Sequence, residues 1–364
     1  HDEFCTWPSG RRGGIRGIVK KYDQSQWERL VDPFYYLTSR EVKGEPGQET
    51  IRLSRADIVP QDLFSIMEFS EQQTAFANLF YNYNGEMWIS NLISGDLGNY
   101  ISQGVQFLQG TVEAVERRVS FLQRGQTQVF NHFDPDTGKD YRSLLPEVIC
   151  ALESGRIISI DTTLMSEMEQ FLITTIIART LFTLRKALKS AQDVESLEDC
   201  INQALGVQPG NPTTGMRSFA RTIIDALRAG RLPYIRENRL TRLDELPLVN
   251  VVIEEAPSVL NPDRMRFGSV FRDISRQGRK FGIGLTVISQ QVSAIDQGIL
   301  TQLNTEITLA LGNESERREA IKNASTDLYG FEKELQVMGK GQAILTASYR
   351  DVPLPVQAPL FDDL

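Results

Sequence analysis

The sequence predicts an α/β fold built on a mainly parallel sheet with helices on both faces. In the second half of the chain, short runs of apolar and β-branched residues alternate with stretches whose apolar residues recur at helical spacing. The strand-like runs are continuously apolar, which is typical of parallel strands covered on both sides. With 364 residues, 41% of them hydrophobic, the chain is long enough to bury a large core.

Four parts are expected along the chain. Residues 1–58 mix short β-rich runs, at 15–19 and 33–37, with loops rich in glycine and charge, and they are interpreted as an incomplete N-terminal part of the core. Residues 59–150 carry apolar side chains at helical spacing and predict a helical insertion. Residues 151–352 alternate strand and helix and form the main core. Residues 353–364, with three prolines, predict an extended tail.

The elements of the main core follow from the same periodicities. Strands are expected at 157–160, 248–253, 283–289, 306–311 and 342–345, and helices at 165–189, 216–229 and 264–279. The longest apolar stretch, around 171–178, continues into Arg179, Arg185 and Lys186. It is too short to span a bilayer and predicts a buried helix, so no membrane association is expected.

Composition limits the function. A net charge of −8 repels nucleic acid from the average surface, so any DNA contact needs a local basic patch or a lumen. Cys5, Cys150 and Cys200 are widely spaced and unpaired in pattern, which argues against a disulfide framework or a zinc site and favours a cytoplasmic location. Because His1 and His132 are the only histidines, neither a His-based triad nor a multi-His metal site is expected.

Two adjacent carboxylates are the strongest indication of chemistry. The apolar strand 248–253 is followed at once by Glu254 and Glu255. Open α/β sheets bind their ligands at the carboxyl ends of their strands. In a nucleotide hydrolase one such carboxylate helps to hold Mg²⁺ through its water shell, and the next orients or deprotonates the attacking water. The alternative is a solvated glutamate pair at the start of a loop.

A second group of polar residues surrounds the next strand. Arg276 and Arg279 precede strand 283–288, and Gln290 follows it. An amide at this strand end can sense the γ-phosphate or the attacking water, and an arginine before the strand can reach a neighbouring subunit's nucleotide. The alternatives are cations that stabilise a helix C-terminus and an amide that caps a strand.

Taken together, these segments resemble the HerA/FtsK branch of the RecA-like P-loop ATPases. The run 251–291 contains a Glu-Glu-Ala Walker B, an Arg-x-Gly-Arg-Lys-Phe-Gly segment and a Ser-Gln strand end. The resemblance continues through 302–305 and 335–345. The first four residues, His-Asp-Glu-Phe, are similar to the family's His-Gly-Glu-Tyr segment, with Asp2 in place of Gly and Phe4 in place of Tyr.

The resemblance implies roles for individual residues. Glu254 would belong to the Mg²⁺ shell, Glu255 would be the catalytic base or position the water, and Gln290 would be the sensor. Arg279 would be the arginine finger, with Arg276 as its close rival. One further acidic residue is implied at the nucleotide, namely Glu3.

The resemblance also implies an activity and partners. It predicts an ATP-driven helicase that translocates on double-stranded DNA as a homo-hexamer, with Mg²⁺ as cofactor. The implied partner is a NurA-type nuclease in DNA-end processing, or an effector protein in defence against phage.

A phosphate-binding loop is missing from these 364 residues. Gly138-Lys139 is followed by Asp140, and Gly339-Lys340 is followed by Gly341, so neither fits the Walker A pattern. In the family, that loop and an N-terminal β-barrel come before the segment that starts here. We therefore expect sequence upstream of His1, and we expect the 364 residues alone to be inactive.

A contact with DNA is the hardest feature to place. Arg11, Arg12 and Arg16 lie in a glycine-rich, cationic loop that can follow a phosphate backbone, or can be a solvated turn.

Two rival hypotheses for the function remain. One is a ring-forming scaffold that organises an effector, with regulatory or no ATP turnover. The other is a conjugative coupling or packaging motor.

Overall fold

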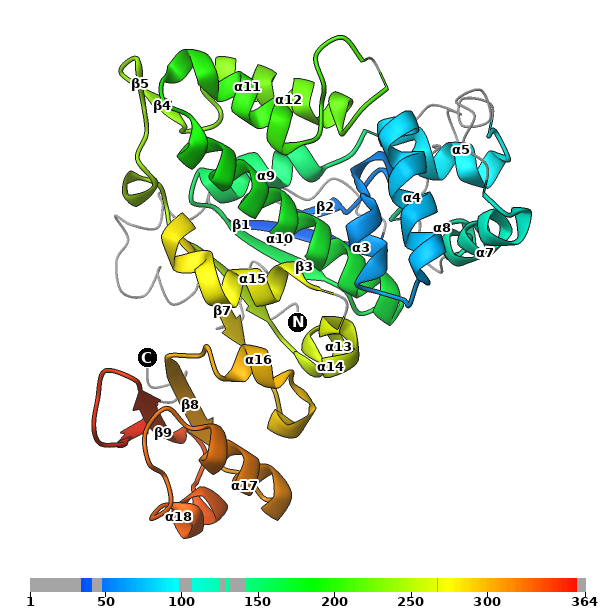
Figure 1. Ribbon diagram of the computed structural model, residues 1–364. Coiled ribbons are helices and arrows are strands. Elements are labelled where there is room, and N and C mark those ends of the chain that lie inside the picture. Colours follow the sequence, from blue (N-terminus) through cyan, green and yellow to red (C-terminus); the bar gives the residue numbers. More distant parts are fainter. Residues whose placement is uncertain are drawn as a thin grey trace.

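The computed structural model describes most of the chain (Figure 1). The described residues are 34–40, 48–97, 107–124, 129–130, 142–211, 213–266 and 268–358. The predicted positions Glu3, Arg11, Arg12 and Arg16 lie outside these residues, as does the β-rich run 15–19.

Two groups of parallel strands confirm the α/β fold class. β1 (Phe34–Thr38) lies between β2 (Gln48–Thr50) and β3 (Ile157–Asp161) and is parallel to both. β6 (Val249–Ile253) and β7 (Ile283–Val287) form a second parallel pair, in which Val249 is opposite Ile283. Parallel strands need long crossover connections, and several helices lie in the chain between β6 and β7.

A small antiparallel sheet near the C-terminus is the exception to this parallel arrangement. β9 (Gln342–Ala347) lies between β8 (Thr305–Leu309) and β10 (Leu354–Gln357), antiparallel to both. β10 falls within the segment predicted as an extended tail; the short connection from β9 brings it back as an antiparallel neighbour. Residues of β9, α17 (Glu314–Asn323) and α18 (Glu332–Val337) contribute to a separate small core. In Figure 1 this module, orange to red, lies below the rest of the chain.

The helical insertion predicted from residue 59 contains helices in its described part. They are α3 (Pro60–Phe64), α4 (Glu71–Asn84), η3 (Gly85–Met87), α5 (Trp88–Ser94), α7 (Gln109–Val119) and α8 (Phe121–Arg124), preceded by η2 (Arg55–Asp57). Phe76, Phe80 and Trp88 are fully buried among them. α4 begins at a capping box in which Ser70 and Gln73 satisfy each other's backbone N–H groups.

The long helix α10 (Glu167–Ser190) connects the insertion to the strands. Its N-terminus is fixed by a Ser166–Glu169 capping box, and most of its circumference is buried, as its apolar sequence predicts. Helices packed around it include α9 (Leu145–Glu153), α11 (Val194–Ala204), α3 and α15 (Val270–Gln277). α9 runs across the predicted boundary at residue 150.

The remaining elements connect the core strands. They are α12 (Arg217–Arg228), β4 (Ile235–Arg236), β5 (Arg239–Leu240), η4 (Leu243–Glu245), α13 (Pro257–Leu260), α14 (Pro262–Met265), α15 (Val270–Gln277), η5 (Gly278–Phe281), η6 (Val292–Ala294) and α16 (Gln297–Leu300). In the part of the chain that the structure describes, no helix combines the length and hydrophobicity that a membrane span requires.

The predicted helix 264–279 is wrong as a single helix, because it is interrupted between α14 and α15. α14 ends at Met265, and Gly268, with φ +92°, has a left-handed conformation that does not continue a helix. The side chain of Ser269 then accepts a hydrogen bond from the backbone N–H of Phe271 and starts the second.

A fully buried ion pair fixes the starts of β6 and β7. Arg185 of α10 donates from Nε and Nη2 to the two carboxylate oxygens of Glu153, at 3.0 and 2.9 Å. The same guanidinium donates to the carbonyl oxygens of Pro247, Phe281 and Gly282, at 2.8 to 2.9 Å. Because these carbonyls come just before the two strands, one side chain sets where both begin.

Gly282 is required by this arrangement. It has φ +64°, and a Cβ atom there would lie 2.8 Å from Nη1 of Arg185. Tyr234 completes the network, since its hydroxyl donates to Glu153 at 2.9 Å.

We predict that Arg185→Met lowers the free energy of unfolding by about 3–5 kcal/mol, because Glu153 is left buried and uncompensated. Urea denaturation measures the change. The control is Arg228→Met, which removes an ion pair with Glu198 in which both side chains are partly exposed, and should cost less than about 1 kcal/mol. If the two variants lost equal free energy of unfolding, the buried network would contribute no more to stability than the exposed ion pair.

A second buried carboxylate predicts how stability depends on pH. Asp57 accepts hydrogen bonds from the backbone N–H of Ser54 and the hydroxyl of Ser143, and burial raises its pKa to about 6 from 3.8. A raised acid pKa means that the folded state holds its proton more tightly. Its contribution to stability is therefore present below pH 4 and lost as the pH rises through 6.

Asp57→Asn should remove this contribution while keeping an oxygen that accepts both hydrogen bonds. Between pH 4 and 7 the unfolding free energy of the variant should fall less than that of the natural protein, by up to about 3 kcal/mol. Thermal and urea denaturation across this range measure the difference. Asp199→Asn, an exposed position on α11, should follow the natural protein.

Candidate active site

Glu254 and Glu255 protrude from the carboxyl end of β6. The backbone N–H of Ile288 donates to the carbonyl of Ile253 at 2.9 Å, and the carbonyl of Ile288 accepts from the N–H of Ala256 at 3.1 Å. Both glutamates therefore lie between two hydrogen bonds to a single residue of the neighbouring chain segment. This bulge exposes both of them at the strand end where the sequence predicted them.

Glu255 has an unusual backbone conformation. Its φ is +48°, in the left-handed region that disfavours residues with a side chain. Among the described residues, Glu237 and Asn238 are the other non-glycine residues with positive φ, and both lie in the turn between β4 and β5. Such strain costs of the order of 1 kcal/mol and is frequent at functional sites.

Gln290 follows β7 at the same end of the strand pair. The Ser289 hydroxyl accepts from the N–H of Gln291 and donates to its carbonyl, both at 2.9 Å, so Gln290 is the exposed tip of a tight turn. Because β6 and β7 are parallel, with Ile253 opposite Val287, the structure brings the predicted sensor and the two carboxylates to one edge.

One face of the β6–β7 pair is exposed, so the prediction that both faces are covered is wrong for these strands. Val252 and Ile288 are 54% and 47% exposed, and Leu248, before β6, is 83% exposed. On this face Asn250 and Thr286 form a hydrogen bond of 2.8 Å across the strands. The polar residues at alternate positions are the sequence feature that distinguishes this face from a buried one.

Arg276 and Arg279 lie at the opposite end of the same strands. They belong to the end of α15 and to η5, which precede β7, and both are exposed. Five residues of β7 separate this end from the glutamates, a length of about 16 Å. The structure therefore does not bring the arginines together with the carboxylates of the same chain.

Two lysines that the sequence analysis missed belong to the arginine end. The Nζ atom of Lys189, in α10, lies 5.0 Å from the ring centroid of Phe281. Phe281 belongs to η5, the short helix that also contains Arg279 and Lys280. Lys186 lies 4.1 Å from the ring centroid of Phe182, which packs edge-on against Phe281. Cations held over aromatic rings are stabilised by the ring quadrupole.

These lysines and arginines form a cationic cluster at the η5 end, namely Lys186, Lys189, Arg276, Arg279 and Lys280, all exposed. About 90 residues of sequence separate the two lysines of α10 from the basic residues at 276–280, so periodicity could not connect them. The spacing of Lys186 and Lys189 on one helix face was the available indication.

A divalent cation is the ion that the carboxylate edge fits. Glu254 and Glu255 offer hard oxygen ligands at the carboxyl end of a strand. Among the described residues, no three His, Cys, Asp or Glu side chains are close enough to cage a metal ion. This donor set fits Mg²⁺ bound largely through water and phosphate, and it does not fit a structural zinc ion.

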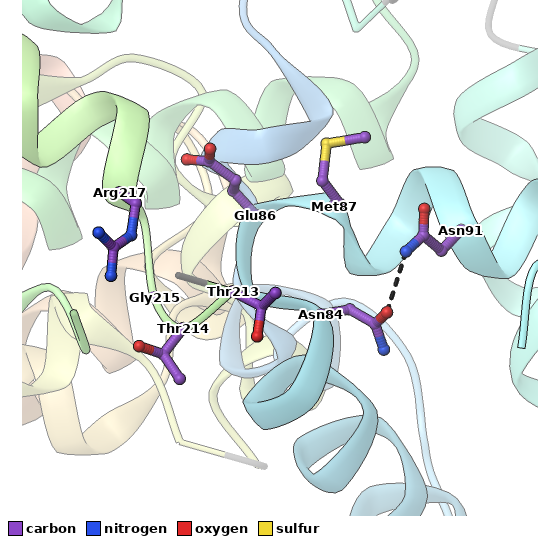
Figure 2. Close-up of a pocket in the computed structure, with 8 residues that line it drawn as sticks. All are labelled: Asn84, Glu86, Met87, Asn91, Thr213, Thr214, Gly215 and Arg217. Carbon is purple, nitrogen blue, oxygen red and sulfur yellow. Dashed lines mark hydrogen bonds between the residues drawn. The ribbon is translucent and has the colours of Figure 1, made fainter. Parts of the chain in front are cut away.

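A cavity of about 150 Å³ lies elsewhere, between the helical insertion and the start of α12 (Figure 2). Asn91 donates to Asn84 on one side of it, at 2.9 Å. Near Arg217, the Glu86 carboxylate accepts hydrogen bonds from the backbone N–H and hydroxyl of Ser218. Glu86 thereby ties the insertion to the N-terminus of α12, and no predicted site residue lines the cavity.

A segment of this chain is similar in sequence to helicases named HerA. The chain is 32% identical over 118 residues to the DNA double-strand break repair helicase HerA of Pyrococcus furiosus, covering 31% of this chain and 21% of that protein. It is 30% identical over 129 residues to HerA of Sulfurisphaera tokodaii, covering 35% and 26%. The resemblance to HerA proteins is confirmed over this segment, which spans about a fifth to a quarter of these relatives.

Solved structures align over more of the chain at lower identity. VirB4 of Thermoanaerobacter pseudethanolicus aligns with a TM-score of 0.49 and 12% identity, over 94% of this chain and 80% of its own. The conjugative coupling protein TrwBΔN70 aligns with a TM-score of 0.48 and 10% identity, over 90% and 74%. No protein-family model matches the chain.

The strain at Glu255 gives a direct test of the site geometry. Glycine adopts positive φ freely, whereas at an ordinary position it weakens the fold. We expect Glu255→Gly to be more stable than Glu254→Gly by about 1–2 kcal/mol, measured by thermal denaturation. Equal stabilities would mean that Glu255 is not held in a left-handed conformation in solution.

Proposed function

We propose that this chain is part of an ATP-driven motor that translocates on double-stranded DNA, a HerA-like helicase with a RecA-like core. The observation that carries the proposal is that Glu254 and Glu255 are exposed at the carboxyl end of β6, at the same edge as Gln290. The segment similarity to HerA helicases supports it.

The proposed chemistry is in-line attack of water on the γ-phosphate of ATP, in which the new P–O bond forms as the bond to the β,γ-bridging oxygen breaks and ADP leaves. Glu255 positions the water and accepts its proton, and Gln290 hydrogen-bonds to the water or the γ-phosphate. Glu254 would hold Mg²⁺ through its water shell, and the bound ion would supply neutralisation of charge on the phosphates. Glu3 is proposed to line the nucleotide.

Assembly is part of the proposed mechanism. Because Arg276 and Arg279 lie at the far end of β7, they reach a nucleotide only in a neighbouring copy of the chain. A head-to-tail contact closes into a ring when the rotation between successive copies completes a full turn. We propose a homo-hexamer of this kind, in which Arg279, or its rival Arg276, is the finger.

Other parts of the proposal concern the whole protein. Arg11, Arg12 and Arg16 would contact the DNA backbone. The partner would be a NurA-type nuclease in DNA repair or an effector in anti-phage defence, and the protein would work in the cytoplasm. We also propose that ATP hydrolysis needs a phosphate-binding loop that these 364 residues do not contain.

The first test compares ATPase activity of the complete gene product, the 364-residue chain and the complete Glu255→Gln variant, each with and without duplex DNA. We expect DNA-stimulated hydrolysis by the complete protein alone, and a fall of at least about 100-fold in Glu255→Gln. Rings without DNA-dependent turnover would overturn the motor proposal and favour the scaffold hypothesis.

A mixing experiment tests whether the arginine acts between copies. Glu255→Gln and Arg279→Ala should each be inactive alone. In equal mixtures, about a quarter of the contacts pair an intact Glu255 with an intact Arg279, so activity should partly return. Arg276→Ala replaces Arg279→Ala in a parallel mixture to decide between the two arginines. If no mixture regains activity, neither arginine serves a neighbouring site.

A further inference from the structure

The peptide unit that follows Glu255 is held at both of its polar atoms. Its N–H, which belongs to Ala256, donates to the carbonyl of Ile288 at 3.1 Å. Its carbonyl, which belongs to Glu255, accepts from the backbone N–H of Ser258 at 3.0 Å and from the Ser258 hydroxyl at 2.8 Å. Of the groups that hydrogen-bond to this peptide unit, only the Ser258 hydroxyl belongs to a side chain.

Fixing this peptide matters because the conformation of Glu255 is intrinsically unfavourable. At φ +48° the free energy of the residue is higher than in an ordinary backbone conformation. Rotation back to that conformation is therefore favourable unless neighbouring groups prevent it. A rotation about its backbone would move the carboxylate by ångströms. In a hydrolase, misplacing a catalytic group by about 1 Å costs up to about 100-fold in rate.

Ser258 is itself well anchored. It lies in α13, whose Val259 and Leu260 are buried in the main core, and α13 packs against α10. Pro257 precedes it and has no N–H, so Ser258 is the first residue of α13 able to donate from its backbone. The Ser258 side chain adds a second donor to the same carbonyl.

We infer that Ser258 is a positioning residue for Glu255, acting through the Glu255 carbonyl; this rests on the proposed ATPase function. Ser258 does not touch the nucleotide. It holds the strained peptide so that the Glu255 carboxylate stays where the attacking water must be. Loss of the hydroxyl should therefore slow the chemical step and leave nucleotide binding unchanged.

The test uses the complete gene product with saturating duplex DNA. Ser258→Ala should lower kcat roughly tenfold and leave KM for ATP within about twofold. Ser258→Thr keeps the hydroxyl and should retain kcat. The matched control is Ser120→Ala, because the Ser120 hydroxyl donates to the carbonyl three residues earlier, Arg117, at the same 2.8 Å but in the helical insertion. That variant should keep both constants.

A double variant separates positioning from a general loss of structure. If Ser258 acts through Glu255, adding Ser258→Ala to Glu255→Gln should lower the residual rate no further, since the group to be positioned is gone. Thermal denaturation should place Ser258→Ala and Ser120→Ala within about 2 °C of each other.

Two outcomes would overturn the inference while leaving the proposed function intact. One is an unchanged kcat in Ser258→Ala; the other is a lowered kcat that Ser258→Thr does not restore or that adds fully to Glu255→Gln. If instead the complete natural protein shows no ATPase activity, or Glu255→Gln is as active as it, the proposed function itself fails and the positioning role falls with it.

Discussion

The buried ion pair between Arg185 and Glu153 is the interaction on which the rest of the core depends. Two charges without solvent are tolerated only when every hydrogen-bonding group is satisfied, and the carbonyls of Pro247, Phe281 and Gly282 complete that requirement. The same contacts join α10 to the starts of β6 and β7. A helix that also packs on the helical insertion therefore fixes the register of the strands that carry the site.

With their starts fixed, the two strands separate opposite charges. The acidic edge with Glu254 and Glu255 lies at the carboxyl end, and the cationic cluster lies about 16 Å away at the other. A single chain cannot close this distance without breaking the strands. Head-to-tail association brings unlike ends together, and this geometry is the physical reason for proposing that hydrolysis depends on assembly.

Local sequence predicted much of this architecture. The apolar runs located β1, β3, β6 and β7, and the helical periodicity located α10, because each of these elements buries a face whose pattern repeats along the chain. The glutamate pair and Gln290 followed from the same reasoning, since side chains after parallel strands must lie at one edge.

Other features depend on contacts between distant segments. The contact between Lys189 and the ring of Phe281 could not be read from periodicity, because the two residues lie far apart in the sequence. The left-handed conformation of Glu255 is likewise imposed by hydrogen bonds to Ile288 and Ser258. The sequence by itself determined that Glu254, Glu255 and Gln290 follow parallel strands, and therefore at which strand ends they lie. Only the tertiary structure decided their backbone strain and the distance between acid and arginine, because both arise from contacts across the fold.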